Sequence, residues 1–178
     1  MRKRLSRVVS ALFIIFFIII IAFGVMRALF PRAHIEYIKK YSHKFGVDSS
    51  LVLALIKAES NFNTDAVSHA NAKGIMQLTE ETFEFCNDTL KTDAGDILSP
   101  EENIRAGVWY LSYLIERYNG SCKNALAAYN AGATNVDKWL SDSRYSDDGK
   151  TLKEIPFGKT YRHTEKITRY KIIYDFLY

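Results

Sequence analysis

Residues 51–59 read LVLALIKAE, a run that is apolar on nearly every face when it is wound into a helix. A helix of this kind is buried in the core of a globular domain. Glu59 ends the run, so we expect its carboxyl group to be partly desolvated and to face the negative end of the helix dipole. Both conditions favour the protonated acid, which is the form that a general acid needs. The alternative is a solvated glutamate at a helix terminus.

Cap residues and apolar side chains at helical spacing predict further helices on both sides of this run. Asp48 can cap the start of the buried helix, and Gly46 can end the helix before it. No convincing strand or repeat occurs, so the sequence predicts a small, mainly α domain. The predicted helices are residues 35–45, 49–59, one after Thr79, one from Pro100 (capped by Ser99) to about Asn119, 121–129, 136–140 and 160–176, with polar loops at 61–73 and 141–153.

The charge of the chain is concentrated at its N-terminus. The 178 residues carry a formal charge of +4, and five of the 24 basic residues lie within residues 1–27, which hold no acidic residue. Without them, 19 basic residues stand against 20 acidic ones, so the rest of the chain is near neutral. This distribution offers no basic face for nucleic acid, and it indicates a targeting role for the N-terminal charges.

Residues 8–26 form an uncharged and almost wholly apolar segment of 19 residues. As a helix it would be about 28 Å long, close to the hydrocarbon thickness of a bilayer. The basic tail at residues 1–7 predicts that the N-terminus stays in the cytoplasm. We therefore predict a single-pass anchor in the cell membrane, a linker at 27–34 and an extracytoplasmic domain at 35–178. A signal peptide cleaved near residues 22–24 is the alternative.

Two cysteines, Cys86 and Cys122, lie in the exported part of the chain. An oxidising compartment permits a disulfide between them, which would close a loop of about 35 residues and stabilise the fold by about 3–4 kcal/mol. Two unpaired, buried thiols are the alternative. No spacing of histidine and cysteine typical of a zinc site occurs, and we expect no metal and no cofactor.

Three blocks of sequence, in this order, resemble the signatures of the soluble lytic transglycosylase family. Members of that family have a goose-type-lysozyme-like fold and cleave the glycan strands of peptidoglycan. The resemblance runs from about Ile35 to the C-terminus and implies a lysozyme-like domain whose partner is peptidoglycan. The blocks are Glu59-Ser60-Asn61-Phe62 with Ala66-Val67-Ser68 and Gly74-Ile75-Met76-Gln77, then Ala127-Ala128-Tyr129-Asn130-Ala131-Gly132, then Ile155-Pro156-Phe157 with Thr160.

The resemblance implies a catalytic role for Glu59 and a set of substrate-binding residues. In the family, the glutamine of the first block holds substrate, the tyrosine hydroxyl of the second lies near the catalytic carboxylate, and the asparagine helps to bind sugar. Each residue also has a structural alternative, such as a turn hydrogen bond for the serine and a place in the core for the methionine or the tyrosine. The substrate-binding residues implied in this way are Ser68, Met76, Gln77, Tyr129 and Asn130.

The chain departs from the family pattern at a few positions. Asn71 stands where a glycine is usual, and asparagine tolerates the left-handed conformation that such a turn needs. In the third block Lys159 replaces a glutamate, and His163-Thr164 replace Tyr-Val. We assign Lys159 no catalytic role. We interpret His163 as a surface histidine on a polar helix face, with a titratable substitute for the tyrosine as the alternative.

The sequence offers one well-placed carboxylate, whereas ordinary glycosidases use two. The resemblance implies a route that needs only one: Glu59 protonates the glycosidic oxygen and then takes a proton from the muramyl C6 hydroxyl, which closes a 1,6-anhydro ring without water. The function predicted is therefore a peptidoglycan lytic transglycosylase. The alternatives are a lysozyme-type muramidase, with Asp65 as a second carboxylate, and a non-catalytic peptidoglycan-binding scaffold.

Overall fold

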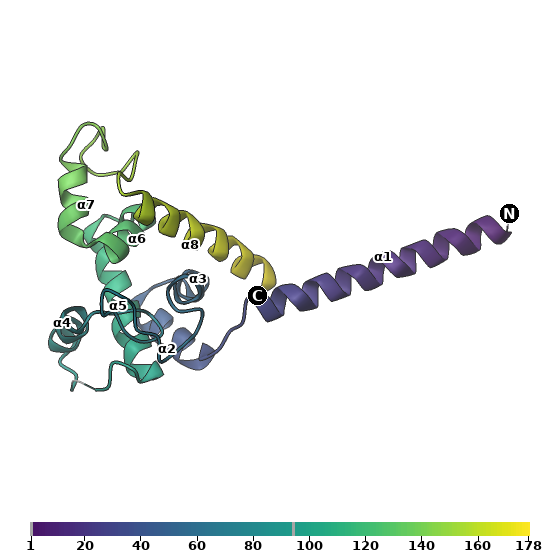
Figure 1. The fold of residues 1–178 in the computed structure, drawn as a ribbon, viewed down its shortest axis with the longest axis horizontal. Coiled ribbons are helices and arrows are strands. Elements are labelled where there is room, and N and C mark those ends of the chain that lie inside the picture. Colours follow the sequence, from purple (N-terminus) through teal and green to yellow (C-terminus); the bar gives the residue numbers. More distant parts are fainter. Residues whose placement is uncertain (1, 94) are drawn as a thin grey trace. The chain divides into compact units, whose positions relative to one another are not determined.

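The computed structural model describes residues 2–93 and 95–178, except for the side chains of residues 2–9 and 11. The chain divides into two compact units, one that extends to Arg32 and one that spans Ala33–Phe176. Figure 1 shows the helices that make up each unit. The two units are described separately below.

The first unit is a long apolar helix, α1 (Arg2–Leu29). Its segment Leu12–Leu29 has a mean hydropathy of 2.8 and none of it is buried, so by length and composition it could cross a membrane. A secretory signal sequence has the same properties. The basic side chains predicted to form a cytoplasmic tail at residues 2–7, and Met1 itself, lie outside the described residues.

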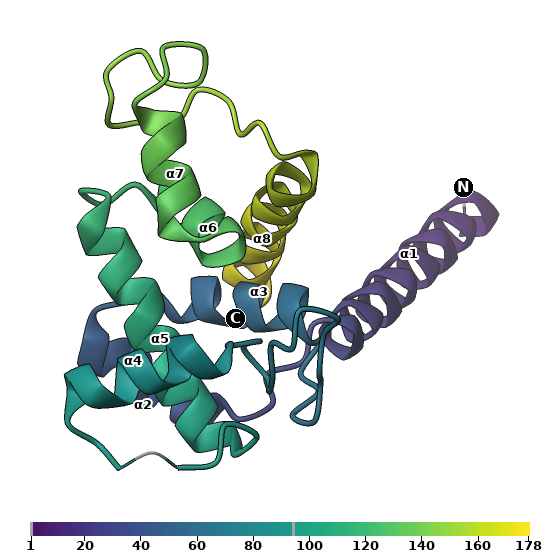
Figure 2. The ribbon, with the colours of Figure 1, turned by 60° about the vertical axis from the view of Figure 1, so that its left-hand side comes forward.

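The second unit is built from helices, which confirms the mainly α prediction. Helix α5 packs against α2, α4 and α6, while α2 also contacts α3 and α6 also contacts α7. Figures 1 and 2 show α3 between α8 on one side and α2 on the other. Within the described residues no strand is formed, and the only β pairing consists of isolated bridges. The helices are α2 (Ile35–Phe45), α3 (Ser49–Glu59), α4 (Glu80–Leu90), α5 (Pro100–Arg117), α6 (Cys122–Ala131), α7 (Ala133–Leu140) and α8 (Gly158–Leu177).

Most of the predicted helix ends are confirmed by their capping geometry. Asp48 Oδ1 accepts hydrogen bonds from the backbone of Ser50 at 2.7 Å and of Leu51 at 3.3 Å. Gly46 ends α2 with φ 67°, a left-handed conformation that glycine adopts without strain. Ser99 occupies the N-cap position of α5, as predicted, but its side chain makes no cap hydrogen bond. Helix α5 instead begins on a proline, whose fixed φ suits the first helical turn.

The apolar run that begins at residue 51 is buried, as predicted. Every residue from Leu51 to Ile56 is at most 4% exposed, and Val52, Ala54, Leu55 and Ile56 are fully buried. Burying each large aliphatic side chain stabilises the fold by about 1.5–3 kcal/mol. The central position of α3 therefore follows from its composition, and it fixes where Glu59 emerges from the core.

The loop after α3 is held by a buried asparagine of α5. Asn103 Oδ1 accepts a hydrogen bond from Met76 N at 2.7 Å, and its Nδ2 donates to Ile97 O at 2.7 Å and Lys73 O at 3.1 Å. Gly74, with φ 76°, passes so close to Asn103 that a Cβ there would lie 2.7 Å from Ile97 O. The left-handed conformation expected of Asn71 is confirmed, with φ 59°.

The two cysteines are unpaired, so the disulfide alternative was wrong. Cys86 is fully buried in the core between α4 and α5, where desolvation raises the pKa of its thiol to about 12. Cys122 is exposed at the start of α6, and the alternative of two buried thiols therefore holds for Cys86 only.

Candidate active site

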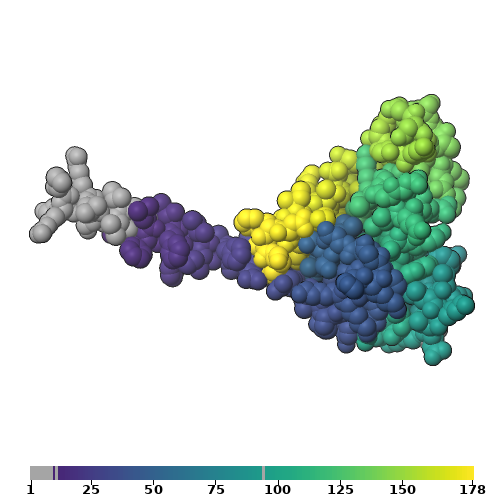
Figure 3. Space-filling model, turned by 180° about the vertical axis from the view of Figure 1, so that it is seen from behind, coloured from purple at the N-terminus to yellow at the C-terminus, as the bar shows by residue number. Residues whose placement is uncertain are grey.

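Glu59 is the last residue of α3, and its side chain is 14% exposed. The expectation of partial desolvation at the end of a buried helix is met. Two contacts fix this end of the helix: Ser60 Oγ donates to Ile75 O at 2.7 Å, and Lys166 Nζ of α8 donates to Ala58 O at 3.3 Å. The carboxyl group is therefore held where α3 meets both the following loop and α8. Figure 3 shows the surface of α8, in yellow, beside the blue surface that includes α3.

The backbone around Glu59 is unusually strained. Asn61 and Phe62, two and three residues after Glu59, have φ values of 54° and 66°, and Gln77 has φ 52°. Left-handed conformations are uncommon for residues other than glycine and costly for bulky ones. Such residues gather at functional sites, where the surrounding structure holds them in place. This feature was not visible in the sequence, since none of the three is a residue that demands the conformation.

The amide of Gln77 braces the loop that follows α3. Its Nε2 donates to Ala66 O at 3.0 Å and to Gly74 O at 2.9 Å, so both amide hydrogens are used within the loop. The amide oxygen is the polar atom left for a ligand. The loop thus sets the orientation of the Gln77 amide.

The structure assigns Met76 a place in the core. Its side chain is fully buried against α5, where it lies over Gly107, and so it offers no surface to a ligand. Its carbonyl oxygen accepts a hydrogen bond from the hydroxyl of Tyr129 at 2.9 Å. The packing alternative therefore describes Met76 better than a sugar contact does.

Tyr129 of α6 is half-buried beside Glu59. Burial raises the pKa of its hydroxyl well above the ordinary value of 10.0, and the negative charge of Glu59 contributes to the rise. The phenol therefore stays protonated and donates to Met76 O. Its ring lies 5.5 Å from that of Tyr110 on α5. The structure thus brings Tyr129 close to the carboxyl group without a hydrogen bond between the two side chains.

The other two predicted substrate-binding residues, Ser68 and Asn130, make hydrogen bonds within the fold. Asn130 Oδ1 accepts from Thr160 Oγ1 at 2.9 Å, which ties the end of α6 to the start of α8. Ser68 Oγ accepts from Ala72 N at 3.1 Å inside the loop. The amide nitrogen of Asn130 and the hydroxyl hydrogen of Ser68 are the groups each could still offer to a ligand.

His163 is the residue that sequence reasoning misplaced. Its side chain is only 14% exposed, and its Nε2 lies 3.2 Å from Glu59 Oε1. The interpretation as a surface histidine was wrong because α8 packs across the end of α3. A signal was present in the sequence: position 163 is three residues after Thr160 and four before Ile167, both of which are buried, and helical spacing places all three on one face.

Three further acidic residues, one of them the predicted alternative Asp65, make no contact with Glu59 among the described interactions. Asp65 is exposed in the loop after α3. Glu80 pairs with Lys73 at 2.6 Å, and Asp137 pairs with Arg117 at 2.7 Å. Within the described residues, no group of three or more histidine, cysteine or acidic side chains could hold a metal ion. Glu59 therefore remains the single carboxylate of this site.

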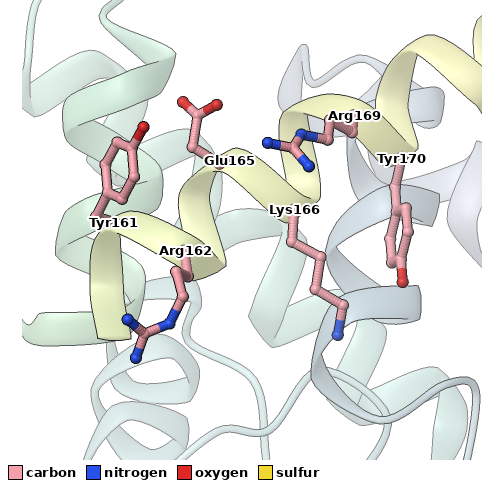
Figure 4. Close-up of a pocket in the computed structure, with 6 residues that line it drawn as sticks. All are labelled: Tyr161, Arg162, Glu165, Lys166, Arg169 and Tyr170. Atoms are coloured by element: carbon pink, nitrogen blue, oxygen red, sulfur yellow. The ribbon is translucent and has the colours of Figure 1, made fainter. Parts of the chain in front are cut away.

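A shallow cavity of about 530 Å³ lies on α8 near the same site. Figure 4 shows Lys166 and Tyr170 pointing to one side of the helix, and Glu165 to the other. Lys166 connects the cavity to the end of α3 through its contact with Ala58. The residues that line it are Tyr161, Arg162, Glu165, Lys166, Arg169 and Tyr170.

Comparison with known proteins places these features in a family. The model of the family described as "Transglycosylase SLT domain" matches residues 36–152. The membrane-bound lytic murein transglycosylase C of Serratia proteamaculans is 35% identical over 127 residues, which are 64% of this chain and 36% of that protein. The soluble lytic murein transglycosylase of Escherichia coli (strain K12) is 30% identical over 152 residues, 83% of this chain and 24% of that protein.

Solved structures show the same fold. A lytic transglycosylase from Pseudomonas aeruginosa, described as an inactive mutant, matches with a TM-score of 0.72 at 33% identity, over 82% of this chain and 24% of that one. The 70-kDa soluble lytic transglycosylase from Escherichia coli matches with a TM-score of 0.74 at 25% identity, over 85% of this chain and 25% of that one. The chain thus spans between a quarter and about a third of the length of these four proteins, and the family match ends before α8.

Proposed function

The chain belongs to the Transglycosylase SLT domain family, and we propose that it is a peptidoglycan lytic transglycosylase in which Glu59 is the catalytic acid. One observation carries the proposal: the single carboxylate of the site emerges from a buried helix, at 14% exposure, beside the loop that ends at Gln77 and beside Tyr129. A partly buried carboxyl group that keeps contact with a surface loop can hold a proton for a bound substrate.

In the proposed reaction, Glu59 acts twice. It first donates its proton to the glycosidic oxygen between N-acetylmuramic acid and N-acetylglucosamine, as the bond from C1 to that oxygen breaks. The ionised carboxylate then accepts the proton of the muramyl C6 hydroxyl, whose oxygen forms the new bond to C1. The product carries a 1,6-anhydro ring, and no water is consumed. An intramolecular nucleophile of this kind has a high effective concentration, so no second carboxylate is needed to activate water.

The surrounding residues orient the substrate in this proposal. The amide oxygen of Gln77, the amide nitrogen of Asn130 and the hydroxyl of Ser68 hydrogen-bond sugar groups, because each of these atoms is left over from the contacts within the fold. Tyr129 keeps its proton and presents a neutral ring beside Glu59. Met76 contributes through its carbonyl, which holds the hydroxyl of Tyr129 in place.

The proposal extends to the membrane. Helix α1 spans the cell membrane once, with the N-terminus in the cytoplasm and the domain from residue 35 outside, where peptidoglycan lies. The apolar segment Leu12–Leu29 and the similarity to membrane-bound relatives support an association with the membrane. The excess of basic residues before the apolar segment supports the orientation. Reporter fusions at each end of the chain test it, and a reporter at the C-terminus that is active only in the cytoplasm must stay silent.

The experiment that tests the activity is mass spectrometry of the fragments that the full chain, in detergent, releases from purified peptidoglycan. The proposal expects muropeptides that are one water lighter than those with reducing ends. Fragments with reducing ends would instead establish a muramidase that uses water. Binding to the cell wall without release of any fragment would establish the non-catalytic scaffold. Glu59→Gln serves as the control, because it preserves the shape of the side chain and removes its proton donor.

A further inference from the structure

The imidazole of His163 is buried without the hydrogen bonds that its ring nitrogens need. Neither Nδ1 nor Nε2 has a hydrogen-bond partner among the described residues, and both atoms are inaccessible to solvent. Nε2 nevertheless lies 3.2 Å from Glu59 Oε1, at ion-pair distance but not in hydrogen-bonding alignment. Buried polar groups in native proteins are nearly always satisfied, so an unsatisfied ring next to the proposed catalytic acid calls for a role.

We propose that His163 is the positioning residue of Glu59, whose charged imidazole holds the carboxyl group toward the scissile bond and makes it a stronger acid. This inference rests on the proposed function and names a residue for it from α8, outside the range that the family model matches. A small rotation of either side chain would turn the contact of 3.2 Å into a charge-assisted hydrogen bond.

Neighbouring polar groups on α3 and α6 make hydrogen bonds of their own. On α3, Lys57 donates to Asn61 in the following loop. On α6, the hydroxyl of Tyr129 donates to a backbone carbonyl and, with its raised pKa, stays neutral. Among the ion pairs of the described residues, His163 is the one partner of Glu59.

The charged neighbours on α8 are turned to other contacts. Lys166 donates to Ala58 O, and Arg162 is exposed on the face that lines the surface cavity. Both are cations, so they do not hold His163 in its charged form. Among the described ion pairs, the acidic group that lies opposite the imidazole is that of Glu59 on α3.

Two effects on catalysis follow from a cation at this distance from the carboxyl group. A nearby positive charge favours the ionised carboxylate, so Glu59 gives up its proton to the leaving oxygen more readily. The same charge lowers the pH up to which the carboxyl group stays protonated. Removal of the cation should therefore slow the reaction at its optimum and move the alkaline limb of the activity profile to higher pH.

The first test compares His163→Leu with His163→Gln in the full chain. Leucine removes both the charge and the donor, whereas the amide nitrogen of glutamine lies close to the position of Nε2 and keeps a donor without a titratable charge. We expect kcat of His163→Leu to fall about tenfold, with KM changed by less than about twofold. The midpoint of the alkaline limb of its pH–activity profile should move up by about one pH unit. His163→Gln should recover only the part of kcat that depends on the donor, because it lacks the charge, and for the same reason its alkaline limb should stay shifted.

The matched control is His43→Gln, which removes an exposed histidine at the end of α2. It should leave both kcat and the pH profile unchanged. Wild-type pH profiles for both substitutions of His163, whatever their kcat, would overturn the proposal and leave His163 as a packing residue.

The second test does not depend on activity. The ring signal of His163, identified by its loss in His163→Gln, is followed by NMR against pH in the labelled full chain in detergent. The pH at which this signal is half-shifted should fall by about one unit in Glu59→Gln, because the carboxylate that favours the imidazolium is gone. An unchanged midpoint would overturn the proposal. Cleavage of glycan by Glu59→Gln would instead overturn the proposed function, and the NMR result would still report on the pair.

Discussion

The proposed active site has two parts with different origins. The first part, residues 59–77 and 127–132, lies inside the range that the family model matches, and it supplies Glu59, Gln77 and Tyr129. The second part is the start of α8, outside that range, and it supplies Thr160 and His163. Hydrogen bonds within the loop and to α5 hold the first part, whereas contacts of α8 with α3 and α6 hold the second.

The difference teaches that local sequence blocks describe a loop better than they describe a helix face. In the loop of the first part, residues of the same sequence block hydrogen-bond to one another. The sequence of the block therefore predicts how the loop is folded. In the second part, the role of a side chain depends on which distant element the helix packs against. The predictions below test whether the first part supplies the chemistry and the second part tunes it.

The largest effect is expected for Glu59→Gln. If the first part supplies the chemistry, the rate of glycan cleavage should fall by about 10²–10⁴-fold, since the general acid is removed. The release of soluble muropeptides measures the rate. The thermal midpoint should change little, because the glutamine fills the same space at the end of α3. Cleavage at a rate near that of the wild type would contradict the assignment of Glu59 and the view that the first part supplies the chemistry.

The fold was predictable from the sequence because its signals are local. The apolar run from Leu51 to Ile56 and the caps at Asp48 and Gly46 each depend on neighbouring residues, and all of them hold in the structure. Ser99 takes the predicted N-cap position, but its side chain makes no cap hydrogen bond, since such a bond is optional where proline already starts the helix. The cysteine pairing failed for another reason, since it depends on the distance between α4 and α6, on which the sequence carries no information.

The candidate site was predictable only in part. Glu59 could be singled out because burial and position at a helix end combine in one short stretch. Met76 could not be assigned correctly, since a methionine in a motif reads the same whether its side chain lines a cleft or fills the core. The support from Asn103 was missed because a single asparagine in a helix gives no sign of the backbone atoms that it will reach on another element.

The next largest effect is expected for Gly74→Ala. A Cβ at this position would lie 2.7 Å from Ile97 O and would also meet the amide of Asn103, which holds the loop of the first part. Such overpacking costs about 1–3 kcal/mol, in addition to the strain of φ 76°. Urea unfolding measures the loss, and glycan cleavage should fall with it because Met76 and Gln77 shift.

Gly120→Ala is the matched control for this substitution. Gly120 has φ 84° and no atom within 4 Å of a Cβ, so it suffers the backbone strain without the steric clash. The difference between the two variants gives the contribution of the close approach. Equal losses of stability would show that the contact with Asn103 does not hold the loop.

A smaller effect is expected for Tyr129→Phe. The substitution removes the hydrogen bond to Met76 O and leaves that carbonyl without its partner. The free energy of unfolding should fall by about 1 kcal/mol. Tyr110→Phe, in the neighbouring ring on α5, serves as the comparison in urea unfolding. Since the phenol of Tyr129 is neutral, its loss should leave the alkaline limb of activity in place, in contrast to substitutions of His163. A shifted alkaline limb of the pH–activity profile in Tyr129→Phe would show that the first part also contributes to tuning the acidity of Glu59.

The smallest effect is expected at the junction of the two parts, where Thr160 donates to Asn130 at 2.9 Å. Thr160→Val keeps the shape of the side chain and removes the donor, and Asn130→Ala removes the acceptor. In a double-mutant cycle measured by urea unfolding, the two should show a coupling of about 0.5–1.5 kcal/mol. Thr160→Val should also lower kcat severalfold, since α8 carries His163 and a looser junction moves it relative to Glu59. If the coupling is present but kcat and the pH profile do not change, the hydrogen bond between Thr160 and Asn130 contributes to stability alone. The effect of His163 on Glu59 then does not depend on this hydrogen bond.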